Sequence, residues 1–421
     1  MDEVVISVTK TGELFGSSQM VFESAQFPPN IFLVPYAGES VEIEYPDIIR
    51  TESDITLEYN RICVRRIYCR PDNENPHSGN GSLENPFANF GDAVSWFKCM
   101  SIRVCADMFQ IILLPGDSMI DLSEVPDSSN LIIGDLAAIE RQVVLNNHYI
   151  YLRGSILAGL LINGTGGICC RSMINCTCNT GSFEPIENVI NSDISALQFM
   201  AHTIYGSRID MSSDEPSDAV KLVCEYLSSS TLNINASYIT CWVKESLCSS
   251  KASICYTKGL QYASDKPQIV IGRVEKSELT LKDIFLSVNS ELFNSVISFF
   301  GITHNYNVAH ITAVRCTSKT PIINNVSISA EFSWNILDSM DSPEDIGYRN
   351  TVVALHVPDI SQAAIFNLST SVSCSVDYFN ELSAVAKCGI ADGVSGCIHD
   401  CDIRLGSKHE GFNCGAVYDF Q

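Results

Sequence analysis

From residue 111 to about residue 400, the sequence is an array of short apolar stretches with no helix-length pattern. A recurrent stretch of small, polar, apolar, polar and apolar residues returns at intervals of 22 to 25 residues. Its first inward side chains are Ile162, Ile186, Ile209, Leu232, Ile254, Leu279, Ile302 and Val326. A period near 23 residues suits coils of three short strands, each stacked on the next. A β-sandwich with strands every ~8 to 12 residues would give a similar period, so the repeat alone leaves both folds open.

The composition agrees with an all-β chain that carries a large core. Hydrophobic residues make up 46% of the 421 residues and charged residues only 18%, below the usual quarter. The formal net charge of −23 is spread along the chain and repels phosphate backbones, so no nucleic-acid partner is expected. The simplest role of that charge is to keep the protein soluble.

The chain carries no sign of secretion or of membrane insertion. The N-terminus, Met1 to Ile6, has neither a basic region nor an apolar core, which predicts no signal peptide. No apolar run approaches the ~20 residues that span a bilayer, so no membrane partner is expected. We therefore expect synthesis in the cytoplasm, a reducing compartment.

Eighteen cysteines and six Asn-x-Ser/Thr sequons leave a second possibility open. Without a signal peptide, the cysteines are expected to be buried thiols. The sequons, together with that many cysteines, would also suit a secreted adhesin with disulfides. The sequons begin at Asn80, Asn163, Asn175, Asn235, Asn325 and Asn367.

Four segments follow from the distribution of strands and turns. Residues 1–70 read as a small N-terminal β domain, with short strands at residues 4–8, 31–34, 41–44 and 62–64. Residues 71–86 form a turn-rich linker, residues 87–405 hold the strand array, and residues 406–421 form a C-terminal tail or cap. One amphipathic helix begins the array: Asn89 can cap it, and Phe90, Ala93, Val94 and Phe97 give it one apolar stripe.

The start of the array carries a resemblance. Residues 78–87, Ser-Gly-Asn-Gly-Ser-Leu-Glu-Asn-Pro-Phe, are followed by Ala93-Val94 and by residues 111–117, Ile-Ile-Leu-Leu-Pro-Gly-Asp. This series resembles the opening motif of the pectate-lyase-like right-handed parallel β-helix proteins. The match covers about 40 residues, and the 23-residue rhythm would extend it to about residue 400.

The resemblance implies a fold and leaves the function open. It implies an all-β chain: a right-handed parallel β-helix of about a dozen coils with a small N-terminal β domain and one short capping helix. The helix would cover the open end of the first coil, whose unpaired backbone groups would otherwise promote aggregation. The family includes pectin-cleaving enzymes, viral tailspikes, adhesins and capsid-associated proteins, so the fold does not choose among them.

Few residues suggest catalysis. In the proposed register only Asp210 and Glu278 are acidic beside the anchors, and they lie three coils apart. At ~4.8 Å per coil this is ~14 Å, beyond the ~5 to 9.5 Å that separates paired glycosidase carboxyls. The remaining catalytic candidates are Arg208, Asp210 and the acidic loop residues Asp214 and Asp218, which could also gather a cation; an exposed acidic turn explains the loop equally simply.

Two cysteine clusters are candidate metal sites. Cys397, His399, Cys401 and Cys414 could bind tetrahedral zinc, although their spacing matches no Cys-x2-Cys pair. Residues 169–178 hold the second cluster, with Cys169, Cys170, Cys176 and Cys178. Disulfides and buried thiols are the other readings of both clusters. No phosphate-loop, dinucleotide-binding, serine-hydrolase or His-Glu-x-x-His motif occurs, and no cofactor is expected.

The sequence therefore favours a non-enzymatic structural or attachment protein. We expect a virion component, such as a spike, fibre or capsid-associated protein, in which residues 1–70 contact other virion or assembly proteins. The β-helix would present a face that binds a glycan or receptor, and by analogy the protein would be a homotrimer. The alternatives are a polysaccharide lyase or glycoside hydrolase on the same scaffold and the secreted, disulfide-containing adhesin.

Overall fold

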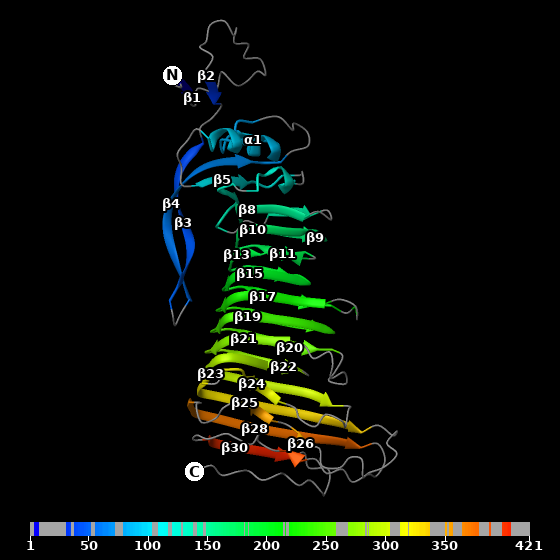
Figure 1. Cartoon of the computed structure of the whole chain (residues 1–421). Helices are drawn as coiled ribbons and strands as arrows, with labels where there is room; N and C mark the ends of the chain where they lie inside the picture. Colours follow the sequence, from blue (N-terminus) through cyan, green and yellow to red (C-terminus); the bar gives the residue numbers. More distant parts are fainter. Residues whose placement is uncertain are drawn as a thin grey trace. The chain divides into compact units, whose positions relative to one another are not determined.

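The described part of the chain is all-β apart from one α-helix and one 3-10 turn, and most of its strands belong to one long sheet (Figure 1). The computed structural model describes residues 4–7, 31–34, 38–51, 55–71, 79–102, 108–116, 120–127, 129–137, 141–145, 149–180, 182–183, 185–213, 215, 219–257, 268–282, 284, 286–303, 312–318, 320–336, 350–351, 353–356, 364–378, 387–388 and 398–405. The chain divides into two compact units, residues 1–192 and 193–421. The four-segment division expected from the sequence stays a prediction.

The first unit holds a hairpin, a helix and a stack of parallel strands. Its elements are β1 (Val4–Ser7), β2 (Ile31–Val34), β3 (Glu39–Arg50), β4 (Ile55–Cys69), α1 (Phe90–Met100), β5 (Met108–Leu113), the 3-10 turn η2 (Leu122–Glu124), β6 (Leu131–Gly134), β7 (Arg141–Leu145), β8 (Tyr149–Ala158), β9 (Leu160–Gly164), β10 (Gly167–Ile174), β11 (Thr177–Asn179), β12 (Ser182–Phe183) and β13 (Ile186–Ile190). The strands expected near residues 4–8, 31–34, 41–44 and 62–64 are confirmed as β1 to β4.

Strands β3 and β4 form a long antiparallel hairpin that covers part of the stack. Their register pairs Val41 with Val64 and Ile43 with Ile62. Because side chains alternate along a strand, one side of the hairpin is apolar. That side packs against a buried cluster in which Val64 of β4 lies with residues of the stack, namely Met108, Ile132, Ile156, Ala158, Ile174 and Ile190. The last part of β4 also pairs in parallel with β5, so the hairpin is continuous with the stack.

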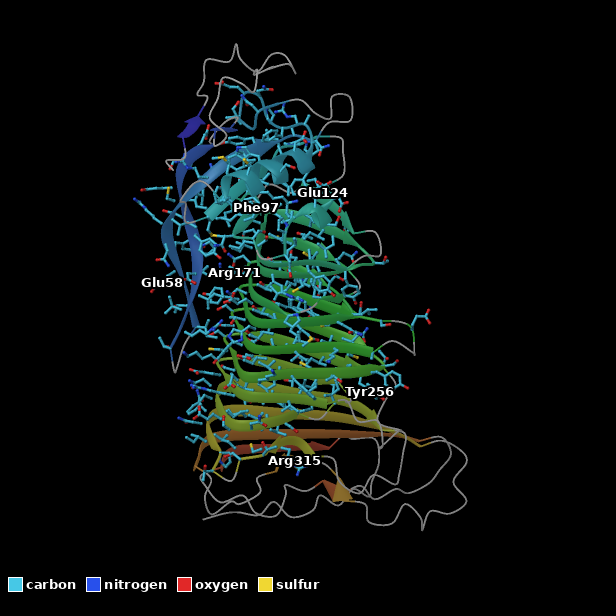
Figure 2. All side chains as sticks on the ribbon, turned by 45° about the horizontal axis from the view of Figure 1, so that its top comes forward. Glu58, Phe97, Glu124, Arg171, Tyr256 and Arg315 are labelled. Atoms are coloured by element: carbon cyan, nitrogen blue, oxygen red, sulfur yellow. The ribbon has the colours of Figure 1, made fainter. Side chains whose placement is uncertain are left out.

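The helix forms where the sequence predicts it. Asn89 accepts a hydrogen bond from the Gly91 N–H and caps α1, and the predicted stripe of Phe90, Ala93, Val94 and Phe97 is buried. The Phe97 ring packs edge-to-face on Phe109 of β5, with 5.4 Å between ring centroids. The described side chains are drawn in Figure 2, where Phe97 is labelled. The helix therefore joins the core of the first unit.

The opening motif makes a tight turn ahead of α1. Asn80 and Gly81 both donate their backbone N–H to the Asn85 carbonyl, at 2.9 and 3.1 Å. Phe87 then pairs with Cys69 at the end of β4. Gly79 and Gly81 have φ of +97° and +84°, a conformation that other residues rarely adopt. The glycines of the motif thus have a direct backbone role.

The second unit is a stack of parallel strands. Its elements are β14 (Asp193–Ser195), β15 (Gln198–Tyr205), β16 (Arg208–Ser212), β17 (Ala219–Ser228), β18 (Thr231–Ala236), β19 (Tyr238–Cys248), β20 (Lys251–Tyr256), β21 (Gln268–Glu275), β22 (Glu278–Lys282), β23 (Leu286–Thr303), β24 (Thr312–Cys316), β25 (Ile322–Ile336), β26 (Asn350–Thr351), β27 (Val353–His356), β28 (Ala364–Tyr378), β29 (Lys387–Cys388) and β30 (Ile398–Leu405). Strand β16 pairs with β18, β18 with β20 and β20 with β22, while β15, β17, β19 and β21 pair in the same way.

The pairing corrects the register expected from the 23-residue period. Ile209 pairs with Leu232 as expected. Leu232 then pairs with Ala252 rather than Ile254, and Leu279 with Ile297 rather than Ile302. Val326, which the period would align with Ile302, pairs with Ser295 instead. Successive aligned positions are Asp210, Asn233, Ser253, Thr280, Ser298 and Ser329, so the interval varies between neighbouring strands.

A ladder of buried serines follows one edge of this stack. Its members are Ser207, Ser230, Ser250, Ser277 and Ser295. The backbone N–H of each of the first four donates to the hydroxyl of the next, at 3.1 to 3.2 Å. Each hydroxyl in turn donates to the carbonyl two residues earlier in its own chain segment. The serines therefore satisfy backbone N–H groups that the turns would leave buried and unpaired.

The residue before each ladder serine has a left-handed backbone. Gly206, Ser229, Ser249, Lys276 and Asn294 have φ between +47° and +61°. The N–H groups of the first four donate to carbonyls of the next strand at 2.9 to 3.1 Å. This hydrogen bonding offsets the cost of about 1 kcal/mol or more that a left-handed conformation imposes on most of these residues.

Ser250 offers a direct test of the ladder. Replacing it by alanine removes the acceptor of the buried Ser230 N–H, and we expect a loss of about 2 kcal/mol in the free energy of unfolding. Ser253, three residues later on β20, is exposed, so Ser253→Ala should change the free energy of unfolding by no more than ~0.5 kcal/mol. Chemical denaturation followed by circular dichroism measures both; equal stability of the two variants would contradict the ladder.

Candidate functional site

The predicted catalytic residues Arg208 and Asp210 lie together on the outer face of β16. Arg208 Nε donates to Asp210 Oδ2 at 2.6 Å, and Asn233 Nδ2 on β18 donates to Asp210 Oδ1 at 2.6 Å. The hydrogen bond and the negative charge of Asp210 raise the pKa of Arg208. Since both oxygens of Asp210 already accept hydrogen bonds, its carboxylate is poorly placed to act as a base or nucleophile.

The second acidic residue of this face is also in an ion pair. Glu278 Oε2 lies 2.9 Å from Lys251 Nζ on the neighbouring strand. The pairing places β22 three strands from β16, which puts Glu278 and Asp210 ~14 Å apart along the stack. A glycosidase pair would need ~5 to 9.5 Å. Asp214 and Asp218, the other acidic candidates, lie outside the described residues.

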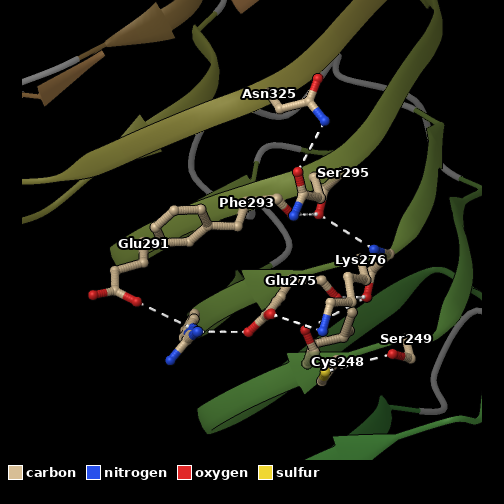
Figure 3. Close-up of polar contacts among 12 residues, drawn as sticks. Cys248, Ser249, Glu275, Lys276, Glu291, Phe293, Ser295 and Asn325 are labelled. Carbon is tan, nitrogen blue, oxygen red and sulfur yellow. Dashed lines mark hydrogen bonds and ion pairs between the residues drawn. The ribbon is translucent and has the colours of Figure 1, made fainter. Parts of the chain in front are cut away.

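A denser charge cluster lies on β21 and β23 (Figure 3). Arg273 contacts two carboxylates, with Nη2 2.5 Å from Glu275 Oε2 and Nε 3.1 Å from Glu291 Oε2. Lys276 Nζ adds a contact of 3.2 Å to Glu275 Oε1. The Arg273 guanidinium also lies 5.8 Å from the centroid of the Phe293 ring. Glu275 is only 9% exposed, so this is the most buried charge network described on the stack.

The chemistry of this cluster is that of a structural brace. It brings two cations and two carboxylates together, so the charges balance. One guanidinium joins Glu275 and Glu291 across adjacent strands. Both carboxylates are engaged by these cations, and the contacts tie β21 to β23. The cluster therefore favours cross-strand stability over acid catalysis.

The side chains of the C-terminal metal candidates lie outside the described part of the structure. Cys397 and Cys414 lie outside the described residues, while His399 and Cys401 lie on β30 with side chains outside the description. Among the His, Cys, Asp and Glu side chains that are described, no group of three or more could hold a metal ion. The zinc site at the C-terminal cluster stays a prediction.

The cysteines of the second cluster are buried thiols. Cys170, Cys176 and Cys178 are at most 2% exposed and are free thiols. Cys176 Sγ lies 3.4 Å from the Leu157 carbonyl and Cys178 Sγ 3.9 Å from Met173 Sδ. Burial raises the pKa of Cys176 to about 11. These thiols pack as small apolar groups and are poor nucleophiles.

Thiol burial predicts a pattern of alkylation and of pH dependence. At pH 8, iodoacetamide should label the exposed Cys63 in the native protein and label Cys241 only after unfolding. Burial raises the pKa of Cys241 to about 12, above the ~8.5 of an unfolded thiol. The stability due to its protonated form is complete below pH ~8.5 and declines as the pH rises towards 12.

Mass spectrometry of native and unfolded samples reads the labelling, and thermal unfolding between pH 7 and 10.5 reads the stability. Labelling of Cys241 at the rate of Cys63 in folded protein would contradict the burial of this thiol. An increase in the thermal midpoint as the pH is raised above 8.5 would contradict the predicted direction of the pH effect.

Two exposed aromatic groups stand on outer faces of the strands. On β8, Tyr149 and Tyr151 are 56% and 41% exposed and are followed by Arg153. On β19 of the second unit, Tyr238 and Trp242 are 38% and 39% exposed. Sequence reasoning did not select either group, although Tyr-x-Tyr-x-Arg at residues 149–153 has the alternation of one strand face.

Charged side chains cover other outer surfaces of the first unit. Arg171 on β10 lies 3.5 Å from Glu187 on β13, and Glu58 is exposed on the hairpin (Figure 2). These contacts are exposed, and exposed ion pairs contribute at most ~1 kcal/mol each. The exposed rings of the two aromatic groups are therefore better suited to an apolar ligand contact than these ion pairs.

Comparisons with known proteins give no direct guide to function. No protein-family model matches the chain, and neither the curated proteins nor the solved structures yield a match. In the described ranges, the single α-helix is too short to cross a membrane.

Proposed function

We propose that this chain is a non-enzymatic structural or attachment protein built on a right-handed parallel β-helix of the pectate-lyase-like kind. The parallel pairing of successive strands supports this fold, as do the glycine turn and helix of the opening motif. In the second unit, β16, β18, β20 and β22 form one column of parallel strands, and β15, β17, β19 and β21 form another. Loops of different lengths between columns suit a helical solenoid.

One observation carries the non-enzymatic role. Four carboxylates on the described faces of the second unit are each held by a lysine or arginine: Asp210 by Arg208, Glu278 by Lys251, and Glu275 and Glu291 by Arg273. Polysaccharide hydrolysis needs a pair of carboxyls in different protonation states at ~5 to 9.5 Å. The described pairs suit a rigid scaffold better.

The proposed setting is a virion or a similar assembled particle. Free buried thiols suit a protein made in a reducing compartment. A long stack of hydrogen-bonded parallel strands suits a spike, fibre or capsid-associated protein that must be rigid. We propose that residues 1–70 contact other particle proteins and that the protein is a homotrimer, the latter by analogy with β-helix spikes.

Two assays test this role. Incubation with polygalacturonate, dextran and heparan sulfate should release neither unsaturated nor reducing ends, and immunoblotting should find the chain in purified particles from cells that express it. Released ends would overturn the proposal in favour of a polysaccharide lyase or glycoside hydrolase. Recovery of the chain only as free secreted protein with disulfides would favour the adhesin.

A further inference from the structure

The outer side of β8 carries a preformed aromatic surface. Along this strand Ile150 and Leu152 point into the core, at 8% and 0% exposure, while Tyr149 and Tyr151 point outward. Arg153, the next outward residue, has a side chain that is 65% exposed. Three neighbouring outward positions therefore hold two phenol rings and a guanidinium. We call Tyr149, Tyr151, Arg153 and Asp127 the β8 platform.

The ring of Tyr149 lies on the backbone of the next strand. Tyr149 is paired with Gly167 of β10, and a Cβ added at Gly167 would lie 2.2 Å from Tyr149 Cε1. The ring therefore occupies the space where any other residue would place its side chain. The absence of a side chain at Gly167 therefore makes room for the Tyr149 ring, and Tyr149 stays 56% exposed.

Arg153 contacts both Tyr151 and Asp127. Its guanidinium lies 5.3 Å from the centroid of the Tyr151 ring. Asp127 holds it from the other side: Oδ2 accepts from Arg153 Nη1 at 3.3 Å, and Oδ1 accepts from the Arg153 backbone N–H at 3.0 Å. The Asp127 carbonyl also accepts from the Gly154 N–H at 2.9 Å. Tyr151 thus lies beside a guanidinium donor that is paired with a carboxylate acceptor.

We propose that the β8 platform binds an uncharged oligosaccharide. The apolar C–H face of a pyranose ring packs on an aromatic ring, and its hydroxyls both donate and accept hydrogen bonds. The guanidinium of Arg153 can donate to a sugar hydroxyl, and the carboxylate of Asp127 can accept from one. This inference rests on the proposed attachment function and gives it a site and a ligand class.

Charge and size select this ligand over others. Arg153 and Asp127 balance each other, and a chain with a formal charge of −23 repels anionic sugars. A specific protein partner usually buries ~800 Å² on each side around an apolar centre. The platform offers two rings bordered by a charged pair, which matches the alternating apolar and hydroxylated surface of a sugar.

Binding of the full chain to a printed panel of oligosaccharides tests the proposal. The oligosaccharides of the panel should carry terminal galactose, mannose, fucose, N-acetylglucosamine, glucuronic acid or sialic acid. We expect binding to at least one uncharged member, and titration calorimetry with it should show that Tyr151→Ala and Arg153→Ala each raise Kd by about tenfold or more. Tyr151→Phe keeps the ring and should stay within about threefold of the parent.

Gly167→Ala supplies a test of positioning. The added methyl group displaces the Tyr149 ring without deleting it, so Kd should rise while the thermal midpoint stays close to that of the parent. Trp242→Ala is the matched control, because it removes an exposed aromatic ring from an outward strand position in the second unit and should leave Kd unchanged.

Several outcomes would overturn the proposal. These are no binding to any member of the panel, binding only to the acidic members, or equal Kd for the parent and Tyr151→Ala. Binding to a glycoprotein that persists after enzymatic deglycosylation would assign the platform to a protein partner. Cleavage of a bound member would overturn the non-enzymatic role, whereas failure to bind without cleavage would overturn only the platform.

Discussion

Replacing Gly79 by alanine is expected to lower the free energy of unfolding of the first unit by about 3 kcal/mol or more. Gly79 has φ of +97°, where a side chain costs about 1–2 kcal/mol. An added Cβ would also lie 1.9 Å from the Pro86 carbonyl oxygen, so the backbone of the turn must move. That movement breaks the hydrogen bonds from Asn80 and Gly81 to Asn85, and losses of this size are typical of such a combination.

Gly159→Asn is the control for this variant. Gly159 has φ of +59° in the same unit, and Asn175 and Asn191 adopt φ of +52° and +48°. Since asparagine tolerates this conformation, the exchange at the buried Gly159 should cost clearly less than Gly79→Ala. Chemical denaturation followed by circular dichroism compares the two. Gly79→Ala as stable as Gly159→Asn would mean that the opening motif does not form the described turn.

Replacing Arg273 by methionine should cost about 3 kcal/mol in the second unit. The exchange keeps apolar volume and removes the charge that joins Glu275 and Glu291. Glu275 is 9% exposed, so it would keep only Lys276 as a described partner cation in a poorly solvated place. Removing one partner of a buried ion pair costs more than the pair itself contributes, because the remaining charge cannot be hydrated.

The exposed pair of Lys251 and Glu278 separates this effect from the general loss of a charge. Their side chains are 70% and 62% exposed, and Lys251→Met should change stability by at most ~1 kcal/mol. Thermal unfolding at low and high salt measures both variants. If Arg273→Met lost no more stability than Lys251→Met, the proposed stabilising role of the Arg273 cluster would be contradicted.

Local features of the fold could be predicted from the sequence because short-range chemistry decides them. A helix cap at Asn89 followed by one apolar stripe predicts an amphipathic helix, and the structure confirms it. The stripe consists of Phe90, Ala93, Val94 and Phe97. The register of the strands could not be predicted in the same way. Loop length costs little free energy, so intervals between aligned residues can vary without disturbing the stack.

That freedom explains why the constant period failed at particular residues. The interval from Leu232 to Ala252 is 20 residues, whereas that from Ala252 to Leu279 is 27. A constant period of about 23 therefore selects Ile254, which lies two residues beyond the aligned position. A better signal was the left-handed residue followed by serine, as in Ser229-Ser230 and Ser249-Ser250, because those turns recur whatever the loop length.

The candidate site was predicted in part for a similar reason. Arg208 and Asp210 are two residues apart on one strand, so alternation alone places them on one face. Glu291, the cross-strand partner of Arg273, and Gly167, which pairs with Tyr149, lie on neighbouring strands, and only the register reveals them. Of the four predicted candidates, Arg208 and Asp210 form a described ion pair, while Asp214 and Asp218 lie outside the described residues.

The register of the stacked strands is the claim on which this account depends, and Cys255 can test it. Cys255 pairs with Lys282, and aligned residues on adjacent strands lie ~4.8 Å apart, within the range that a disulfide spans. Mild oxidation of Lys282→Cys should therefore give a disulfide between Cys255 and the introduced thiol, identified by mass spectrometry of peptides. Thr280→Cys, displaced by two residues, should give none. A disulfide in Thr280→Cys and none in Lys282→Cys would contradict the described stack.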